Sequence, residues 1–152
     1  MPLIEWEFDR SRRYERPMSI AILDIDQGGK GDGTGFADAA VEELARRISA
    51  TLRSVDTFAR CGGGEFLIVL PEQDANHSIL AAERVRAAIA ERPISDESGS
   101  TEATVSIGLA SMNAATPFST PEALIAAADQ ALDAARSAGC NRVCHAAHCS
   151  PK

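Results

Sequence analysis

The order of apolar segments constrains the fold of this chain more than any other feature. One short apolar run is bounded by turn residues, and longer segments carry apolar residues at a spacing of three or four, so strands and helices can be assigned in turn. The predicted core elements are a buried strand at 18–26, a helix at 36–53, a strand at 55–60, a strand at 65–71, a helix at 75–91 and an alternating strand at 102–111. This β-α-β-β-α-β order predicts an α/β fold, an α+β sandwich of the ferredoxin-like type.

Further elements are expected at both ends of that core. Residues 3–17 read as a short amphipathic helix with Ile4, Phe8 and Arg12 on one face, ended by Pro17. At the other end, a helix starts at Thr120-Pro121-Glu122, runs through Arg136, stops before Gly139, and precedes a last strand at 141–146. Residues 94–100 are expected to form a polar loop. The fold is therefore a ferredoxin-like core with an appended helix and strand.

Length and composition narrow the functional classes. A chain of 152 residues has the size of one domain, and its net charge of −7 argues against broad binding to nucleic acid or anionic membranes. No apolar run approaches the roughly 18 residues of a membrane span, and the N-terminus is too charged for a signal peptide. The four cysteines show no disulfide spacing. These features predict a single reduced, cytoplasmic domain over 1–152.

The predicted topology brings two unusual segments together. In a ferredoxin-like sheet, the second hairpin strand lies antiparallel to the first strand, so the turn at 62–64 should lie next to Asp24 and Asp26. That turn consists of three glycines, which suggests close approach of a ligand to the backbone or the loss of a former side chain. We expect an active site, intact or degenerate, at this edge.

Four motifs carry a resemblance to a known family. The stretches DID (24–26), RCGGGEF (60–66), VSIG (105–108) and AGCNRV (138–143) resemble, in this order, the GGDEF domain of diguanylate cyclases. These enzymes make cyclic di-GMP from two GTP molecules. The resemblance, from Arg10 to about Val143, implies a nucleotidyl-cyclase-like fold with an N-terminal linker helix at 1–17 and a tail at 144–152. It also implies the C-terminal part of a larger signalling protein, with an upstream sensor or receiver domain and a homodimer as further partners.

The resemblance also implies a metal site that is incomplete. The family holds two Mg²⁺ or Mn²⁺ ions that activate a 3′-hydroxyl and neutralise the triphosphate. The matching ligands are Asp24 and the backbone carbonyl of Ile25. The third signature position, an acid in the family, is Gly64, and Glu65 is the fourth residue, expected to point the other way.

Other departures fall in the same pocket. Aligned without gaps, the family's two guanine-reading positions are Asp32 and Val41, and its two late basic phosphate contacts are Arg136 and Cys140. Valine cannot accept a hydrogen bond from guanine. We therefore expect no catalytic residue and no required cofactor, with Mg²⁺ needed only if residual cyclase activity exists.

A second family site is intact. The product-inhibition site has the pattern R-x-x-D, which here is Arg53 and Asp56, nine residues before the first signature glycine. The family also uses arginines that match Arg84 and Arg10. Arginine forks can donate to guanine N7 and O6 and to phosphate, and a carboxylate accepts from the Watson–Crick edge. The resemblance thus predicts a cyclic di-GMP receptor without cyclase activity.

Two other functions stay open at this point. One is a weak diguanylate cyclase that uses Asp24 and Glu65 with a metal, and the other is a protein-interaction module that binds no nucleotide. The tail contains Cys140, Cys144, His145, His148 and Cys149, which are zinc-ligand types, but they crowd a strand and a terminus and we set a zinc site aside. Cys61 is expected to be a small packing residue.

Overall fold

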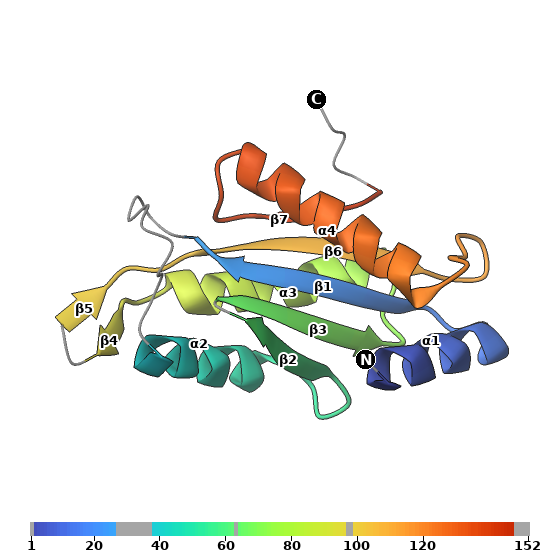
Figure 1. Ribbon diagram of the computed structural model, residues 1–152, viewed down its shortest axis with the longest axis horizontal. Helices are drawn as coiled ribbons and strands as arrows, with labels where there is room; N and C mark the ends of the chain where they lie inside the picture. Colours follow the sequence, from blue (N-terminus) through green and yellow to red (C-terminus); the bar gives the residue numbers. More distant parts are fainter. Residues whose placement is uncertain (1, 27–37, 63, 97–98, 148–152) are drawn as a thin grey trace.

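A computed structural model describes residues 2–26, 38–62, 64–96 and 99–147. Five strands form the main sheet in the order β2-β3-β1-β6-β7, and four helices flank it (Figure 1). The elements are α1 (Pro2–Tyr14), β1 (Met18–Ile25), α2 (Asp38–Thr51), β2 (Thr57–Gly62), β3 (Glu65–Pro71), α3 (Ala75–Ala90), β4 (Ile94–Asp96), β5 (Gly99–Thr101), β6 (Val105–Met112), α4 (Pro121–Ser137) and β7 (Val143–His145).

The strand order confirms the ferredoxin-like prediction. β1 lies in the centre and pairs antiparallel with β3 on one side and with β6 on the other. β2 completes a hairpin with β3, and β7 adds a short parallel edge beyond β6, as expected for the appended strand. The register pairs Met18 with Pro71 at one end of β1 and Asp24 with Glu65 at the other.

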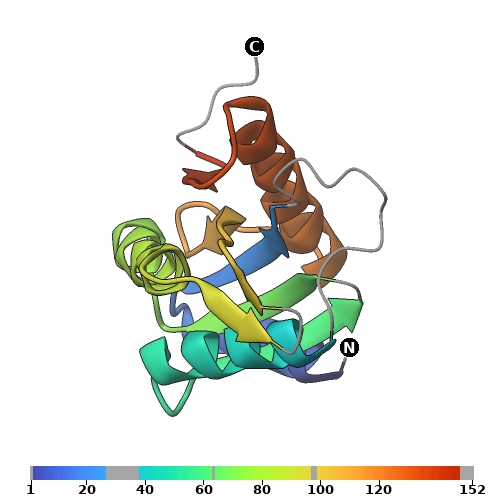
Figure 2. The same cartoon turned by 90° about the vertical axis from the view of Figure 1, so that its left-hand side faces the viewer.

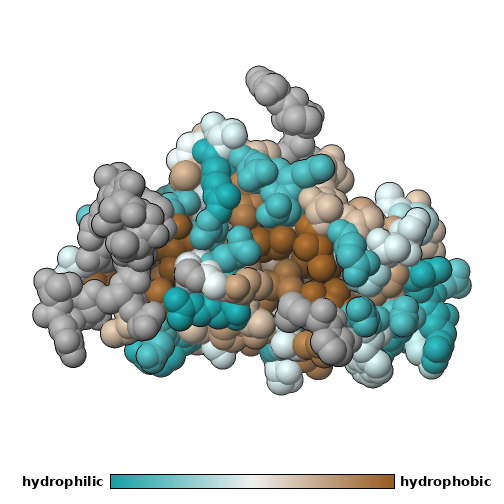
Figure 3. Space-filling view, in the orientation of Figure 1, coloured by the Kyte–Doolittle hydropathy of each residue, from teal (hydrophilic) through white to brown (hydrophobic). Residues whose placement is uncertain are grey.

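Helices cover both faces of the sheet, as the edge-on view in Figure 2 illustrates. The side chains of Ala21, Leu23 and Ile25 alternate with those of Ile20 and Ile22, as expected for a strand buried on two faces. The first set packs with buried residues of α2 and α3, and the second with buried residues of α1 and α4. On the second side, apolar surface is visible beside α4, framed by hydrophilic residues (Figure 3).

The helix boundaries follow the start and stop signals in the sequence. The Thr120 hydroxyl accepts a hydrogen bond from the Ala123 amide at 3.1 Å and so caps α4, and Pro121 occupies its first turn. Gly139, with φ of +123°, follows the end of α4 in a conformation that glycine adopts at little cost. Asp74 caps α3 by accepting from the His77 amide at 2.9 Å.

Two local predictions are wrong. Residues 94–96 and 99–101 pair as the small hairpin β4–β5 rather than a loop, anchored by the buried Ile94. β6 does not alternate, because β1 and β7 pair with its edges while α3 and α4 cover its faces. On α1, Arg12 is exposed but shares the side of Phe8, because its guanidinium lies 5.6 Å from the centre of the Phe8 ring, and Ser11 is buried beside Ile4 and Phe8.

No described helix is long and apolar enough to cross a membrane.

The glycine of the VSIG motif sets the distance between β6 and α4. A Cβ atom placed on Gly108 would lie 2.2 Å from the Ala128 carbonyl oxygen and 2.2 Å from the Leu132 amide nitrogen. Both are backbone atoms of α4, so they cannot move aside without shifting the helix. Glycine is therefore required here by packing and not by an unusual φ angle.

We predict that Gly108→Ala lowers the free energy of unfolding by about 3 kcal/mol, because α4 must move off the sheet to admit one methyl group. Urea denaturation followed by circular dichroism measures this change. An effect below about 0.5 kcal/mol would contradict the close approach of α4 to β6.

Candidate functional site

The glycine turn lies at the end of β1, as the sequence predicted. Asp24 is the register partner of Glu65, and the Ile25 amide donates to the Gly64 carbonyl at 3.0 Å. Opposite residues of an antiparallel pair project to the same face of a sheet, so the Asp24 and Glu65 side chains share a face. A Cβ atom on Gly64 would instead point towards the Ile25 side chain, 3.0 Å from its Cδ1. Gly64 and Glu65 therefore face opposite sides, as expected.

Arg136 of α4 reaches this edge. Its guanidinium pairs with the Asp24 carboxylate, and a second nitrogen lies 3.6 Å from Asp133. The late basic residue that the sequence singled out is thus next to the first acid of DID. The Asp24 side chain is partly exposed, so this pairing neutralises the carboxylate at a modest gain in stability.

Asp26 has a structural role that sequence reasoning missed. Its carboxylate accepts hydrogen bonds from the Thr104 hydroxyl at 2.5 Å, the Ser106 hydroxyl at 2.6 Å and the Asn141 amide at 3.0 Å. It therefore joins the end of β1 to the start of β6 and to the turn after α4. The hydroxyl residues Thr104, directly before VSIG, and Ser106, within it, were the available signal in the sequence.

The ungapped alignment fails on α2. Val41 is 2% exposed and lies in the core with Leu44 and Ile48, at the i, i+3, i+7 spacing of the helix face that packs on the sheet. A residue that reads a nucleobase has to reach the ligand, so Val41 does not occupy a guanine-reading position. Asp38, one turn earlier, is the first residue of α2. Asp32, the other position, lies outside the described residues.

The acids at this edge do not form a metal cluster. In the described part of the chain, no group of three His, Cys, Asp or Glu side chains is arranged to hold a metal ion. Asp24 is paired with Arg136, and the third signature position offers no side chain. The residues present therefore do not fit the two-metal arrangement that the resemblance implies.

Two cysteines lie near this edge. Cys61 was expected to be a packing residue, and Cys140 stands where the family has a basic residue. Cys61 is exposed and not a packing residue, because the β2–β3 register shifts between Arg60 and Gly62 and leaves it in a bulge on the edge strand. Partial desolvation, and secondarily the Glu65 carboxylate, raises the pKa of its thiol. Cys140 follows α4 with a left-handed φ of +65°.

The second predicted site lies at the opposite end of the sheet. Arg53 donates from Nη2 and Nε to the Asp56 carboxylate at 2.8 and 3.2 Å, and the Arg53 backbone amide donates to it at 2.8 Å. A further Nη2 bond of 2.8 Å reaches the carbonyl of Pro71, where β3 ends. The Asp56 side chain is only 2% exposed, so it orients Arg53 and does not face solvent.

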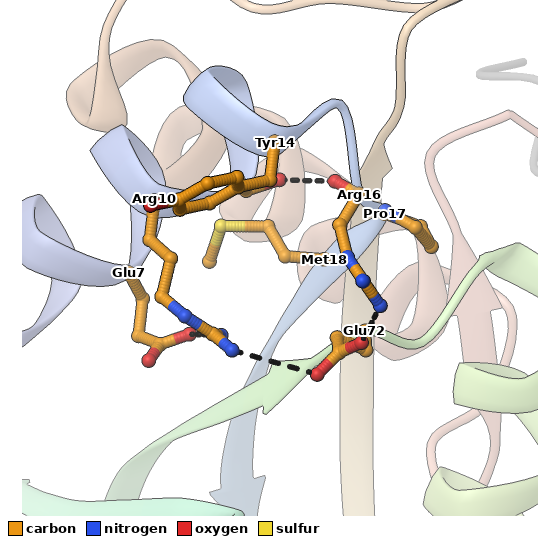
Figure 4. A pocket seen from close by; sticks show the side chains of 8 residues that line it. Glu7, Arg10, Tyr14, Arg16, Pro17, Met18 and Glu72 are labelled. Atoms are coloured by element: carbon orange, nitrogen blue, oxygen red, sulfur yellow. Dashed lines mark hydrogen bonds and ion pairs between the residues drawn. The ribbon is translucent and has the colours of Figure 1, made fainter.

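Arg10 approaches Glu72, which follows Pro71 in the turn after β3. Its Nη2 lies 3.7 Å from the Glu72 carboxylate, and its Nη1 lies 3.7 Å from Glu7 (Figure 4). Arg16, which sequence reasoning missed, donates to the other Glu72 oxygen at 2.6 Å. Arg10 and Arg53 therefore contact neighbouring residues of one turn, although they are 43 positions apart in the sequence.

Arg84 is exposed on α3, the helix that begins directly after this turn. The end of α2 and the middle of α3 pack together, because Leu52 and Ala81 line the same small cavity. Arg53 follows Leu52 in the chain, and Arg84 lies three residues after Ala81. Among the described residues no contact joins Arg84 to Arg53, and their meeting in one site stays a prediction.

The tail is bonded into the fold through His145. Its Nε2 lies 2.8 Å from the Ser111 hydroxyl, and its Nδ1 accepts from the Ala147 amide at 3.0 Å. Cys144 is buried on β7. His148 and Cys149 lie outside the described residues, so the zinc alternative is not tested there.

Comparisons with known proteins agree with this architecture. The family model described as "Diguanylate cyclase, GGDEF domain" matches residues 3–142. Diguanylate cyclase A of Treponema denticola is 32% identical over 141 residues, which is 91% of this chain and 38% of that protein. The chain therefore spans well under half of that relative's length.

Solved structures match over almost the whole chain. The GGDEF domain of DgcB from Caulobacter crescentus, solved in complex with c-di-GMP, superimposes with a TM-score of 0.83 at 25% identity, over 96% of this chain and 87% of that one. The active GGEEF domain of a diguanylate cyclase from Vibrio cholerae gives 0.81 at 25% identity, over 99% and 94%. This chain belongs to the GGDEF family.

We predict that the two acids of DID contribute unequally to stability. Asp26→Ala should lower the free energy of unfolding by about 2–3 kcal/mol, because two hydroxyls and one amide lose a charged acceptor. Asp24→Ala, the matched control two residues away, should cost about 1 kcal/mol or less, since it removes one partly exposed ion pair. Chemical denaturation of both variants checks this, and equal losses would contradict the assignment.

Proposed function

We propose that this domain is a cyclic di-GMP receptor that binds its ligand through Arg53, Arg84 and Arg10, with Asp56 of the same site orienting Arg53, and does not synthesise it. The observation that carries the proposal is the convergence of Arg53 and Arg10 on the turn at Pro71 and Glu72. A related GGDEF domain, that of DgcB, was solved with c-di-GMP. The whole protein would act in bacterial second-messenger signalling.

The chemistry of the site suits the ligand. Cyclic di-GMP carries two phosphodiester charges and two guanines, whereas the chain carries a net charge of −7, so attraction has to come from local arginines. Guanidinium groups donate in a plane to guanine N7 and O6 and pair with phosphate oxygens. Asp56 fixes the Arg53 guanidinium before the ligand arrives, which lowers the cost of ordering it on binding.

Loss of catalysis rests on three features of the glycine-turn edge. Gly64 supplies no carboxylate, Cys140 replaces a basic phosphate contact, and Arg136 is paired with Asp24. Removal of one preorganised electrostatic group commonly lowers a rate about 10²- to 10³-fold. Combined losses should leave no measurable turnover, and no metal cofactor is then needed.

One observation favours the second candidate, a weak diguanylate cyclase. Asp24 and Glu65 are register partners on one face, so both carboxylates could approach a single Mg²⁺ ion if Arg136 moved away. The third candidate is an interaction module that binds no nucleotide. It predicts no binding in a cyclic di-GMP titration.

The domain context is proposed from the family. We place this single domain, with its linker helix at 1–17, after a sensor or receiver domain in a cytoplasmic signalling protein. Ligand binding would be transmitted to that attached domain or to a second copy in a homodimer.

Calorimetry with cyclic di-GMP tests the binding site. We expect a dissociation constant on the order of micromolar, which corresponds to a binding free energy of about −8 kcal/mol. Arg53→Ala should weaken binding by about 2–4 kcal/mol, because ligand acceptors and Asp56 lose their partner. Arg46→Ala removes the same charge from an exposed position on α2 and should change affinity less than twofold. Parental affinity in both Arg53→Ala and Asp56→Ala would exclude this site.

A turnover assay tests the absence of catalysis. With GTP and Mg²⁺ or Mn²⁺, product formation should not exceed that of Asp24→Ala. Gly64→Asp alone should also stay inactive, because Cys140 remains and the new Cβ would be 3.0 Å from the Ile25 side chain. Product well above the Asp24→Ala baseline, from the parent or from Gly64→Asp, would support the weak cyclase instead.

A further inference from the structure

Three arginines from separate segments surround the turn that follows β3. Arg10 belongs to α1, Arg16 to the connection between α1 and β1, and Arg53 to the connection between α2 and β2. Arg10 and Arg16 approach the Glu72 carboxylate from two sides, one at each oxygen (Figure 4). Glu72 thus holds two guanidinium groups in the way a bound phosphate would.

The charges that contact one another at this turn are balanced. The carboxylates of Glu7, Glu72 and Asp56 face the three arginines. A dianionic ligand therefore meets little net positive charge until one carboxylate withdraws. The Asp56 and Glu7 side chains are 2% and 11% exposed and are held by packing, whereas Glu72 is 42% exposed. Glu72 is the carboxylate that can rotate into solvent.

The backbone at Glu72 is also unusual. Its φ of +58° lies in the left-handed region, which a residue with a side chain rarely adopts. Such conformations persist where surrounding contacts hold them, and they often mark sites that change on binding. The two arginine contacts are what hold the Glu72 side chain in the described structure.

We propose that Glu72 acts as an internal anion that occupies Arg10 and Arg16 in the free protein, and that a phosphate of the ligand displaces it. Arg16 is then a further ligand-contacting residue beside the four predicted ones. This inference rests on the proposed function, because its ligand is the bis-phosphodiester cyclic di-GMP. It adds an autoinhibitory contact that sets the affinity of the site.

The test is a substitution that should strengthen binding. Glu72→Gln keeps the shape of the side chain and removes its charge, so it frees both arginines. Because exposed ion pairs are weak, affinity for cyclic di-GMP in calorimetry should rise about threefold to tenfold. Glu122→Gln on α4 lowers the overall negative charge equally and should leave affinity unchanged, which separates a local effect from a global one.

A double-mutant cycle assigns the role of Arg16. Arg16→Ala in the parent removes a ligand contact and also an ion pair that binding must break, so the two effects partly offset. In the Glu72→Gln background only the ligand contact is lost. We therefore expect Arg16→Ala to weaken binding more in that background than in the parent, with thermal melting showing that all variants fold.

The outcomes separate this inference from the proposed function. If Arg53→Ala abolishes binding while Glu72→Gln matches or weakens the parent, the site stands and the displacement model is wrong. An equal rise in affinity in Glu72→Gln and Glu122→Gln also overturns the displacement model, since the effect then comes from overall charge. Absence of binding in both parent and Glu72→Gln overturns the inference together with the receptor function.

Discussion

The antiparallel pairing of β1 with both neighbouring strands is the constraint on which the rest of the structure depends. β1 is covered on both faces and hydrogen-bonded along both edges, so its apolar residues fix the register of β3 and β6 together. A slip by one residue would turn every side chain to the other face and bury Asp24 in the α2–α3 core. The register therefore determines which residues of β3 and β6 lie beside each end of β1.

The same register separates the two candidate sites of the domain. Six steps along β1 place the Asp24–Glu65 pair roughly 20 Å from the Met18–Pro71 pair. The glycine turn and Arg136 are at the first end, and the arginines around Glu72 are at the second. Substitutions that remove a metal ligand at one end can therefore leave the other end unaffected, as the proposed receptor without cyclase activity requires.

The sequence predicted the fold because strand and helix periodicities are local, and their order admits few topologies. It predicted that the glycine turn lies beside Asp24 for the same reason. It misplaced Val41, although the spacing to Leu44 and Ile48 marks a core face, because an ungapped alignment overrode helical periodicity. Arg16 and Glu72 could not be paired from sequence, since their contact depends on how α1 packs against the end of β3.

The most direct test is an NMR titration of the isotope-labelled chain with cyclic di-GMP, following backbone amides. We expect shift changes to concentrate at residues 53–56 and 71–77 and around Arg10 and Arg16, while the signals of residues 24–26 and 64–66 stay near their positions in the free protein. Shift changes concentrated at residues 24–26 and 64–66 would contradict it and place the ligand at the glycine turn. A spectrum unchanged at saturating ligand would contradict the receptor function itself.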